Sequence, residues 1–246
     1  MLKKISMGFA LAVSMLTTLA FFKVHDFFKG INGYAVMFYP LVGLILGSIL
    51  YAISIVLGPY LPATHLHVLV FALWVILTGA LHLDGLSDAI DALFVSKERA
   101  EAVMKDPHVG AMGMTFTGVF LIVKASVLIA IDALWALPLI LMFARFNTVL
   151  AIYFFSYIRE NGMSTLAKQE FTRGQLTTSS LIVLITSLFF PAGLLLLGIS
   201  LLSLLFFKLW FSRRFGGFSG DLYGFMIEGT ELLLLHAVLV WSLLWR

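Results

Sequence analysis

Three aspartates interrupt an otherwise apolar stretch, LHLDGLSDAIDALF, at residues 81–94. Asp84, Asp88 and Asp91 are four and three residues apart, so they share one face of a helix that turns by about 100° per residue. Like charges at this spacing repel, and a charge near hydrocarbon costs about 2.5–3.5 kcal/mol. A buried cation such as Lys124 would offset them, and so would Mg²⁺, which binds a few carboxylates together with water and phosphates. The spacing predicts a metal site, and a solvated acidic helix turn is the alternative.

A second acidic group lies near the end of the chain, where Asp221, Glu228 and Glu231 are spaced seven and three residues apart. We expect both glutamates below the membrane interface, where an unpaired carboxylate is costly. Metal ligation and ion pairing with a buried cation such as Arg145 are both open for them. Gly224, between these residues, would let another helix approach closely.

A glycine-rich segment, RRFGGFSGD, spans residues 213–221. Gly216 and Gly217 could present backbone N–H groups to a phosphate. Arg213 and Arg214 adjoin them, and a guanidinium group matches phosphate geometry. A plain turn, with arginines that only anchor the helix at the membrane surface, is the alternative.

The composition indicates the medium in which these groups work. Hydrophobic residues make up 61% of the 246 residues and charged residues 12%, which is more apolar surface than a soluble domain of this size can bury. Leu-, Ile-, Phe- and Ala-rich runs without period-two alternation predict membrane helices. The chain has no cysteine, which excludes disulfides and thiol chemistry, and its net charge of +3 is too small to imply nucleic acid.

We therefore expect an all-α, polytopic membrane bundle of about seven transmembrane helices, forming one domain over residues 1–246. The expected spans lie near residues 33–57, 66–83, 114–134, 139–157 and 222–245, with two short spans inside 179–211. Pro191 and Gly193 predict the break between those two. The stretch 5–22 is retained in the mature chain, and whether it crosses the membrane or lies in the interface stays open.

The orientation follows from the loop cations. If the spans alternate, one side carries Lys23, Lys29, Lys97, Arg99, Lys105, Arg159, Lys168, Arg173, Lys208, Arg213 and Arg214. The opposite loops, 58–65 and 133–138, have no Lys or Arg. We therefore expect the protein to lie in the cell inner membrane with its basic side facing the cytoplasm. The acidic stretch 81–94 lies on the same side.

Four segments together resemble the cobalamin synthase family, the adenosylcobinamide-GDP ribazoletransferases. They are TGALHLDGLSDAIDALF at 78–94, RAEAVMKDPHVGAMG at 99–113, RRFGGFSGDLYGFMIEGTELLLL at 213–235 and FYPLVGLILG at 38–47. The order is kept over nearly the whole chain. Family members usually have Gly where Ala92 stands and a Ser-Arg pair in place of Pro107 and His108. Two interpretations of the loop are open: His108 replaces the arginine as a weaker donor to the substrate, or the site tolerates the change.

The resemblance implies Mg²⁺-dependent transfer of the adenosylcobinamide phosphate from adenosylcobinamide-GDP to α-ribazole or its 5′-phosphate, with release of GMP. We expect Asp84 and Asp88 to hold the metal, and Asp91 to be a third ligand or the base that takes the ribose proton. His82 is a second candidate base, since its ordinary pKa is near neutrality, or it orients a neighbour. The metal-ligand candidates are Asp84, Asp88, Asp91, Asp221 and Glu228. The substrate-binding candidates are Asp106, Arg145, Arg213, Arg214, Gly216 and Gly217.

Two other classes remain open. The CDP-alcohol phosphotransferases also place aspartates on membrane helices, but their motif needs a glycine directly after the second aspartate, and Ala92 follows Asp91 here. A transporter would show polar residues through the membrane depth and an inverted repeat, and the sequence shows neither. The expected partners are the two substrates and the lipid bilayer, and a homo-oligomer is compatible with the sequence.

Overall fold

The computed structural model describes residues 2–19, 28–159 and 163–244. Within these ranges the chain forms α-helices and one 3₁₀ helix. In chain order they are α1 (Leu2–Leu16), α2 (Ile31–Leu57), α3 (Ala63–Thr78), α4 (Leu81–Leu93), α5 (Lys97–Val103), α6 (Ala111–Ala130), η1 (Leu134–Ala136), α7 (Leu137–Phe154), α8 (Met163–Glu170), α9 (Arg173–Phe189), α10 (Gly193–Arg214) and α11 (Gly220–Leu244). Lys23 and the expected span ends at residues 22 and 245 lie outside the described residues.

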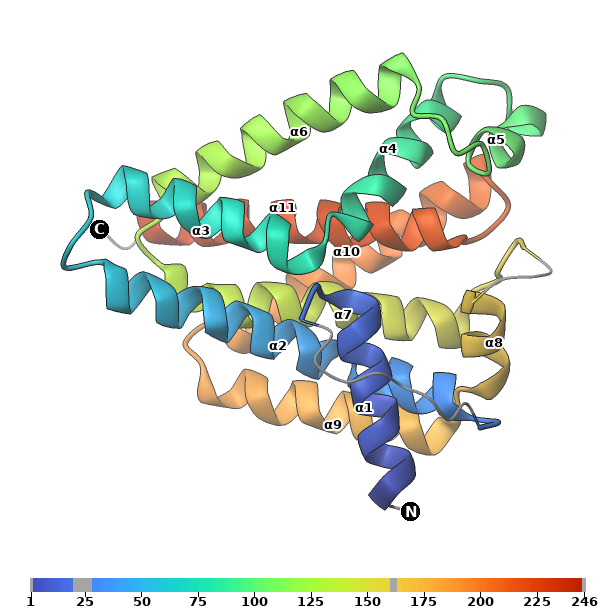
Figure 1. Ribbon diagram of the computed structural model, residues 1–246, viewed down its shortest axis with the longest axis horizontal. Helices are drawn as coiled ribbons and strands as arrows, with labels where there is room; N and C mark the ends of the chain where they lie inside the picture. The colour runs from blue at the N-terminus through green and yellow to red at the C-terminus, as the bar shows by residue number, and fades with distance from the viewer. Residues whose placement is uncertain (1, 20–27, 160–162, 245–246) are drawn as a thin grey trace.

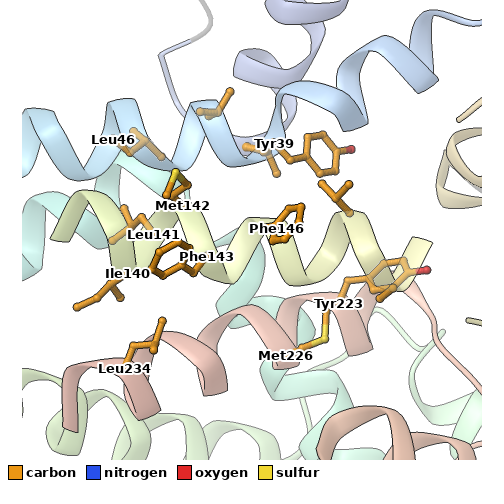
Figure 2. Close-up of a cluster of buried hydrophobic side chains, with 14 of the residues drawn as sticks. Tyr39, Leu46, Ile140, Leu141, Met142, Phe143, Phe146, Tyr223, Met226 and Leu234 are labelled. Atoms are coloured by element: carbon orange, nitrogen blue, oxygen red, sulfur yellow. The ribbon is translucent and has the colours of Figure 1, made fainter. Parts of the chain in front are cut away.

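Helix α7 forms the centre of the bundle. Nearly all its side chains are buried, from Leu137 to Ile152, and Pro138 in its first turn fits a position where a helix needs no N–H donor. It packs between α2 on one side and α10 and α11 on the other. Figure 2 shows the resulting core, with side chains from α2, α7 and α11 meeting along the length of α7.

Within the described residues, five helical segments are long and apolar enough to cross a membrane: α2, α6, η1 with α7, α10 and α11. Their outward faces carry large apolar residues such as Ile122 and Leu202, which are 72% and 67% exposed. Outward apolar faces on helices of this length are expected in contact with lipid. The protein is therefore a multi-pass, all-helical membrane protein, as the composition predicts.

The expected span 66–83 is interrupted by a sharp bend. Helix α3 ends at Thr78, and Gly79 and Ala80 both adopt left-handed backbone angles, with φ of 62° and 55°. The chain bends there by 84° into α4, so Leu81 and the aspartates belong to a separate helix. Counting α3 and α4 as one broken span gives six spans.

The expected count of about seven is higher than this range of five to six. Helix α9 has 17 residues, fewer than the roughly 20 needed to cross a bilayer core. The predicted break between α9 and α10 is confirmed at residues 190–192, where Ala192 is left-handed. Helix α1 has 15 residues and packs across α2.

The two ends of the bundle differ in what they carry. Helices α5 and α8 and the α10–α11 connection lie at one end, opposite the C-terminus (Figure 1). These segments hold Lys97, Arg99, Lys168 and Arg214. The α2–α3 and α9–α10 turns lie at the other end (Figure 1). The basic residues therefore gather at the end where α4 and α11 bring their aspartates.

Candidate active site

In the structure, Asp84 and Asp88 lie on one face of α4, one helical turn apart. Asp84 is exposed and Asp88 half-buried. The charge of Asp88 is opposed by three carboxylates, those of Asp84, Asp221 and Asp91, and attracted by the guanidinium of Arg159. Two of these five groups come from distant parts of the chain. The site therefore has excess negative charge, which is the condition for attracting a cation.

Close packing of α4 against α11 brings Asp221 to this face. A Cβ atom placed on Gly85 would lie 2.8 Å from the carbonyl oxygen of Asp221, and one on Gly224 would lie 2.9 Å from the carbonyl oxygen of His82. Only residues without a side chain fit this crossing. The close approach predicted for Gly224 is confirmed.

A guanidinium group completes the charged rim. Arg159 Nη2 donates to Asp221 Oδ2 at 2.5 Å and to the carbonyl oxygen of Met104 at 3.1 Å. Just before Arg159, residues 156–158 pair with Phe218 through two backbone hydrogen bonds of 2.9 Å. This short bridge fixes Arg159 next to the start of α11.

The glycine-rich segment 213–221 forms a turn that brings Phe218 to the bridge with residues 156–158. Gly216 has a φ of 87°, which favours glycine in a turn. A Cβ on Gly217 would lie 2.7 Å from the carbonyl oxygen of Ser156. The structure thus gives both glycines a structural reason, the turn that was the alternative to a phosphate cradle.

A cavity of about 290 Å³ opens between α1, α2, α4, α7 and α11. Asp84, Asp221 and Arg159 stand among its walls, together with His82 and Gly220. Its remaining walls are mostly aliphatic and tyrosine side chains: Met15, Leu16, Tyr39, Leu81, Ile152, Tyr157, Tyr223 and Ile227. A larger open groove between α7 and α9 holds none of the aspartates. The acidic cavity is therefore the better candidate site.

Several buried polar atoms of this cavity have no hydrogen-bond partner among the described residues. They are His82 Nε2, Thr148 Oγ1, Arg159 Nε and Tyr223 Oη. Leaving a buried donor or acceptor unpaired costs about 1–3 kcal/mol. Such groups gathered at one cavity indicate a site that a ligand or water satisfies.

Asp91 faces away from this cavity. One carboxylate oxygen accepts the backbone N–H of Gly110 at 2.8 Å and the other that of Gly113 at 2.8 Å. These are the first N–H groups of α6, which otherwise have no intrahelical partner, and a carboxylate also suits the positive end of the helix dipole. The structure gives Asp91 a capping role.

A buried ion cluster occupies the space between α6, α7 and α11. Lys124 Nζ lies 2.6 Å from Glu228 Oε2 and 2.5 Å from Glu231 Oε2, and Arg145 pairs with the other oxygen of Glu231. Two cations thus balance two carboxylates. Lys124 also lies 4.3 Å from the centre of the Trp74 ring. Of the two interpretations left open for Glu228, the ion pair is confirmed, and we leave Glu228 out of the metal site.

The buried ion cluster is connected to the cavity by the contact between Arg145 and His82. Arg145 is fully buried, and its Nη2 lies 3.5 Å from His82 Nδ1. Since Arg145 is directed at Glu231 and His82, it acts as an intramembrane partner of these groups.

The remaining candidates have local partners. Arg214 donates to the carbonyl oxygens of Ala92 and Val95, so it caps the C-terminal end of α4. Arg213 is exposed. Asp106 is exposed and accepts hydrogen bonds from the backbone N–H and the ring of His108, at 3.0 and 2.6 Å. None of these three lines the acidic cavity.

The carboxylates at this site suit a Mg²⁺ ion that takes only part of its ligands from the protein. Among the described residues, no three His, Asp or Glu side chains are grouped closely enough to hold a metal by themselves. Mg²⁺ commonly uses one or two carboxylates and completes its shell with water and substrate phosphates. Asp84 and Asp88, one helical turn apart beside Asp221, provide such a partial set.

Three residues that shape the site, Arg159, Tyr157 and Tyr223, carry no signal in the sequence. Arg159 appears in the sequence only as one loop cation among several, and its pairing with Asp221 depends on the bridge to Phe218. The rings of Tyr157 and Tyr223 stack with centroids 6.1 Å apart, but Tyr157 comes from the bridge segment after α7 and Tyr223 from α11. No spacing signal connects them.

The comparison with known proteins agrees with this geometry. Residues 8–239 match the family described as Cobalamin-5-phosphate synthase. The chain is similar to proteins named adenosylcobinamide-GDP ribazoletransferase: it is 36% identical to one from Acinetobacter baumannii (strain ACICU), over 85% of this chain and 87% of the relative. It is 37% identical to one from Desulfitobacterium hafniense (strain Y51), over 80% and 83%.

A third relative of the same name, from Thermosynechococcus vestitus, is 36% identical over 82% of this chain and 85% of its own. No solved structure matches the chain. The match of the family over almost the full length, with the aspartates of α4 and α11 at one cavity, shows that the chain belongs to the cobalamin-5-phosphate synthase family.

Proposed function

We propose that the protein is an adenosylcobinamide-GDP ribazoletransferase that joins adenosylcobinamide phosphate to α-ribazole and releases GMP. The observation that carries this proposal is the meeting of Asp84 and Asp221, from two distant segments, at one cavity at the basic end of the bundle, with the carboxylate of Asp88 close enough to interact with both. The relatives that share this chain's full-length pattern carry the same name.

Asp84 and Asp88 would hold Mg²⁺ at the rim of the cavity. A Mg²⁺ ion held by these two carboxylates would neutralise the diphosphate and stabilise the charge on the leaving GMP. Asp221 lies beside this pair and keeps Arg159 in place. The Arg159 guanidinium, which lines the same cavity, would bind phosphate oxygens of the substrate, whose geometry it suits.

The attack needs a proton acceptor. A ribose hydroxyl of the acceptor attacks the cobinamide phosphorus, the phosphorus–oxygen bond to GMP breaks, and the hydroxyl proton moves to a carboxylate. We assign this proton to Asp84 or Asp221, which line the cavity. Asp91 is set aside because both its oxygens accept backbone N–H groups.

We infer that the basic end faces the cytoplasm from the inner membrane. Cytoplasmic loops of membrane proteins carry an excess of Lys and Arg, and this end carries Lys97 and Arg99 on α5, Lys168 on α8, and Arg213 and Arg214 at the end of α10. Both substrates would then reach the cavity from the compartment that holds nucleotides.

The test is direct. Purified full-length protein in detergent is incubated with adenosylcobinamide-GDP and Mg²⁺, with either α-ribazole or α-ribazole 5′-phosphate, and GMP and the corrinoid product are followed by mass. We expect one GMP per product and no turnover when EDTA removes the metal. Absence of GMP release with both acceptors contradicts the proposal. Transport of a solute by liposomes without nucleotide turnover would favour the transporter class.

A further inference from the structure

The interior of the acidic cavity has a chemistry unlike its rim. His82, Thr148 and Tyr223 are only 4%, 4% and 5% exposed, and each has a polar side-chain atom without a partner among the described residues. All three line the cavity. Because each such atom costs free energy until it is paired, together they indicate an uncharged ligand with a few polar atoms.

The contact with Arg145 decides which nitrogen of His82 carries the hydrogen. A guanidinium only donates hydrogen bonds, so His82 Nδ1, 3.5 Å from Arg145 Nη2, is the acceptor in that pair. A neutral imidazole then carries its hydrogen on Nε2. The unpaired Nε2 atom of His82, a residue that lines the cavity, is therefore a hydrogen-bond donor, held in this tautomer by the Arg145–Glu231 ion pair.

The walls around His82 suit a flat apolar ring. Tyr39 of α2 and Tyr223 of α11 lie near the same end of the core (Figure 2), and both line the cavity together with Tyr157, Leu81 and Ile152. The 290 Å³ volume is close to the lower limit of roughly 300–1,000 Å³ for ligand pockets. It has room for a nucleoside and not for a corrinoid nucleotide.

We propose that this cavity binds the acceptor nucleoside, with His82 Nε2–H donating to the free ring nitrogen of its benzimidazole base. This inference rests on the proposed function, which supplies the acceptor. A dimethylated benzimidazole is a flat apolar bicycle with one unsubstituted nitrogen, and that nitrogen accepts a hydrogen bond. Tyr223 Oη and Thr148 Oγ1 remain for the ribose hydroxyls. Asp84 and Asp221 then stand at the ribose side, beside the phosphate to be attacked.

Guanine is a poorer match for the interior. Its edge presents several N–H donors and a carbonyl, which need paired polar partners. The carboxylates at the cavity are Asp84 on an exposed helix face and Asp221, which is engaged by Arg159. We therefore assign the guanosine half of the donor substrate to a place outside this cavity.

The experiment compares two acceptors on two variants. His82→Leu removes the donor while keeping an apolar side chain of similar size, and His82→Gln keeps an N–H near the position of Nε2. The acceptors are α-ribazole and the matching indole nucleoside, in which a C–H replaces the accepting nitrogen. Steady-state KM is measured for each acceptor, and equilibrium dialysis measures acceptor binding without donor substrate or Mg²⁺.

We expect the wild type to prefer α-ribazole over the indole nucleoside about tenfold, which corresponds to one buried hydrogen bond. His82→Leu should bind both acceptors equally, because its KM for α-ribazole rises about tenfold, and its KM for adenosylcobinamide-GDP should not change. His82→Gln should restore part of the preference for α-ribazole. His67→Gln is the matched control, because His67 is buried on α3, contacts the Ile129 carbonyl and does not line the cavity. It should keep the wild-type preference.

Unchanged discrimination in His82→Leu would overturn the inference, and so would a raised KM for the donor substrate alone. If His82→Leu does not fold, Tyr223→Phe replaces it: loss of the unpaired hydroxyl should raise the KM for α-ribazole several-fold, and an unchanged KM contradicts the inference. Wild-type protein that turns over but shows no preference between the acceptors refutes this inference alone, whereas wild-type protein that releases no GMP refutes the proposed function.

Discussion

Gly85 of α4 lies against the backbone of Asp221 at the start of α11, with 2.8 Å between a Cβ placed on the glycine and the Asp221 carbonyl oxygen. This contact determines how far the acidic face of α4 lies from Asp221. The charged rim of the cavity is therefore set by backbone packing as well as by the carboxylates themselves.

Replacing Gly85 with alanine should separate the two helices. Overpacking of this kind costs about 1–3 kcal/mol, and a displacement of about 1 Å in a site can reduce turnover about a hundredfold. We expect lower thermal stability and strongly reduced GMP release. Gly118→Ala in α6 is the control, since nothing lies within 4 Å of a Cβ there, and it should leave both unchanged or raise stability slightly. Equal behaviour of the two variants would refute the packing argument.

Asp84→Asn and Asp88→Asn test the metal site. Each removes one anionic ligand, and we expect Mg²⁺-dependent turnover to fall at least about a hundredfold. Thermal stability should stay near that of the wild type, because the change relieves repulsion between carboxylates. Glu101→Gln on α5, a half-exposed residue paired with Lys105, should retain full activity. Intact Mg²⁺-dependent turnover in both aspartate variants would remove these residues from the site.

Asp91→Asn separates capping from catalysis. Asparagine keeps one acceptor oxygen for the α6 N–H groups but loses the second oxygen and the charge, so we expect a stability loss of about 1–2 kcal/mol. Turnover per folded molecule should remain within about tenfold of the wild type. Thermal unfolding and GMP release measure the two effects. A loss of turnover as large as that of Asp84→Asn, with stability unchanged, would return Asp91 to the role of ligand or base.

The buried ion cluster should show strong coupling. Lys124→Met leaves Glu228 and Glu231 with Arg145 alone, and breaking a buried pair typically costs about 3–5 kcal/mol. Adding Glu228→Gln restores charge balance, so the double variant should be more stable than Lys124→Met. Stability is measured in detergent for the full cycle. Strictly additive effects would contradict the pairing.

An exposed pair provides the contrast for that cycle. The side chains of Glu101 on α5 and of Lys105, two residues after the end of α5, lie 2.6 Å apart, with about half of each accessible. Lys105→Met should change stability by less than about 1 kcal/mol.

Glu170 predicts a pH-dependent contribution to stability. Its carboxylate accepts the backbone N–H of Asn32 at 3.1 Å and the Asn32 amide at 2.8 Å, at the first turn of α2. Burial would raise the pKa of Glu170, but hydrogen bonds from Gly30 and Asn32 outweigh it and hold the pKa below its ordinary value. A carboxyl group with a lowered folded-state pKa stabilises the fold above its unfolded pKa and loses this effect as the pH falls through the folded one.

We therefore expect Glu170→Gln to lower stability at pH 7 by a few tenths to about 1 kcal/mol. The difference from the wild type should shrink as the pH drops below about 4. Thermal unfolding at both pH values measures this. A difference that grows on acidification would show that the carboxylate is not the stabilising form.

Much of the architecture was accessible from the sequence, because it depends on local chemistry. Apolar runs predict helices in lipid wherever backbone groups must be paired within the segment. Pro191 and Gly193 marked the real break between α9 and α10. The bend after Thr78 was missed, since Gly79 and Ala80 interrupt an apolar run whose composition does not change.

For the site, the sequence by itself determined that Asp84 and Asp88 share a helical face, since the period of a helix is a property of consecutive residues. Which groups meet that face was decided only by the tertiary structure. Asp221 reaches it through the α4–α11 crossing, whereas Asp91 turns to α6 and Glu228 to Lys124. Identical carboxylates thus take different roles, because their partners lie far away in the chain and packing alone brings them together.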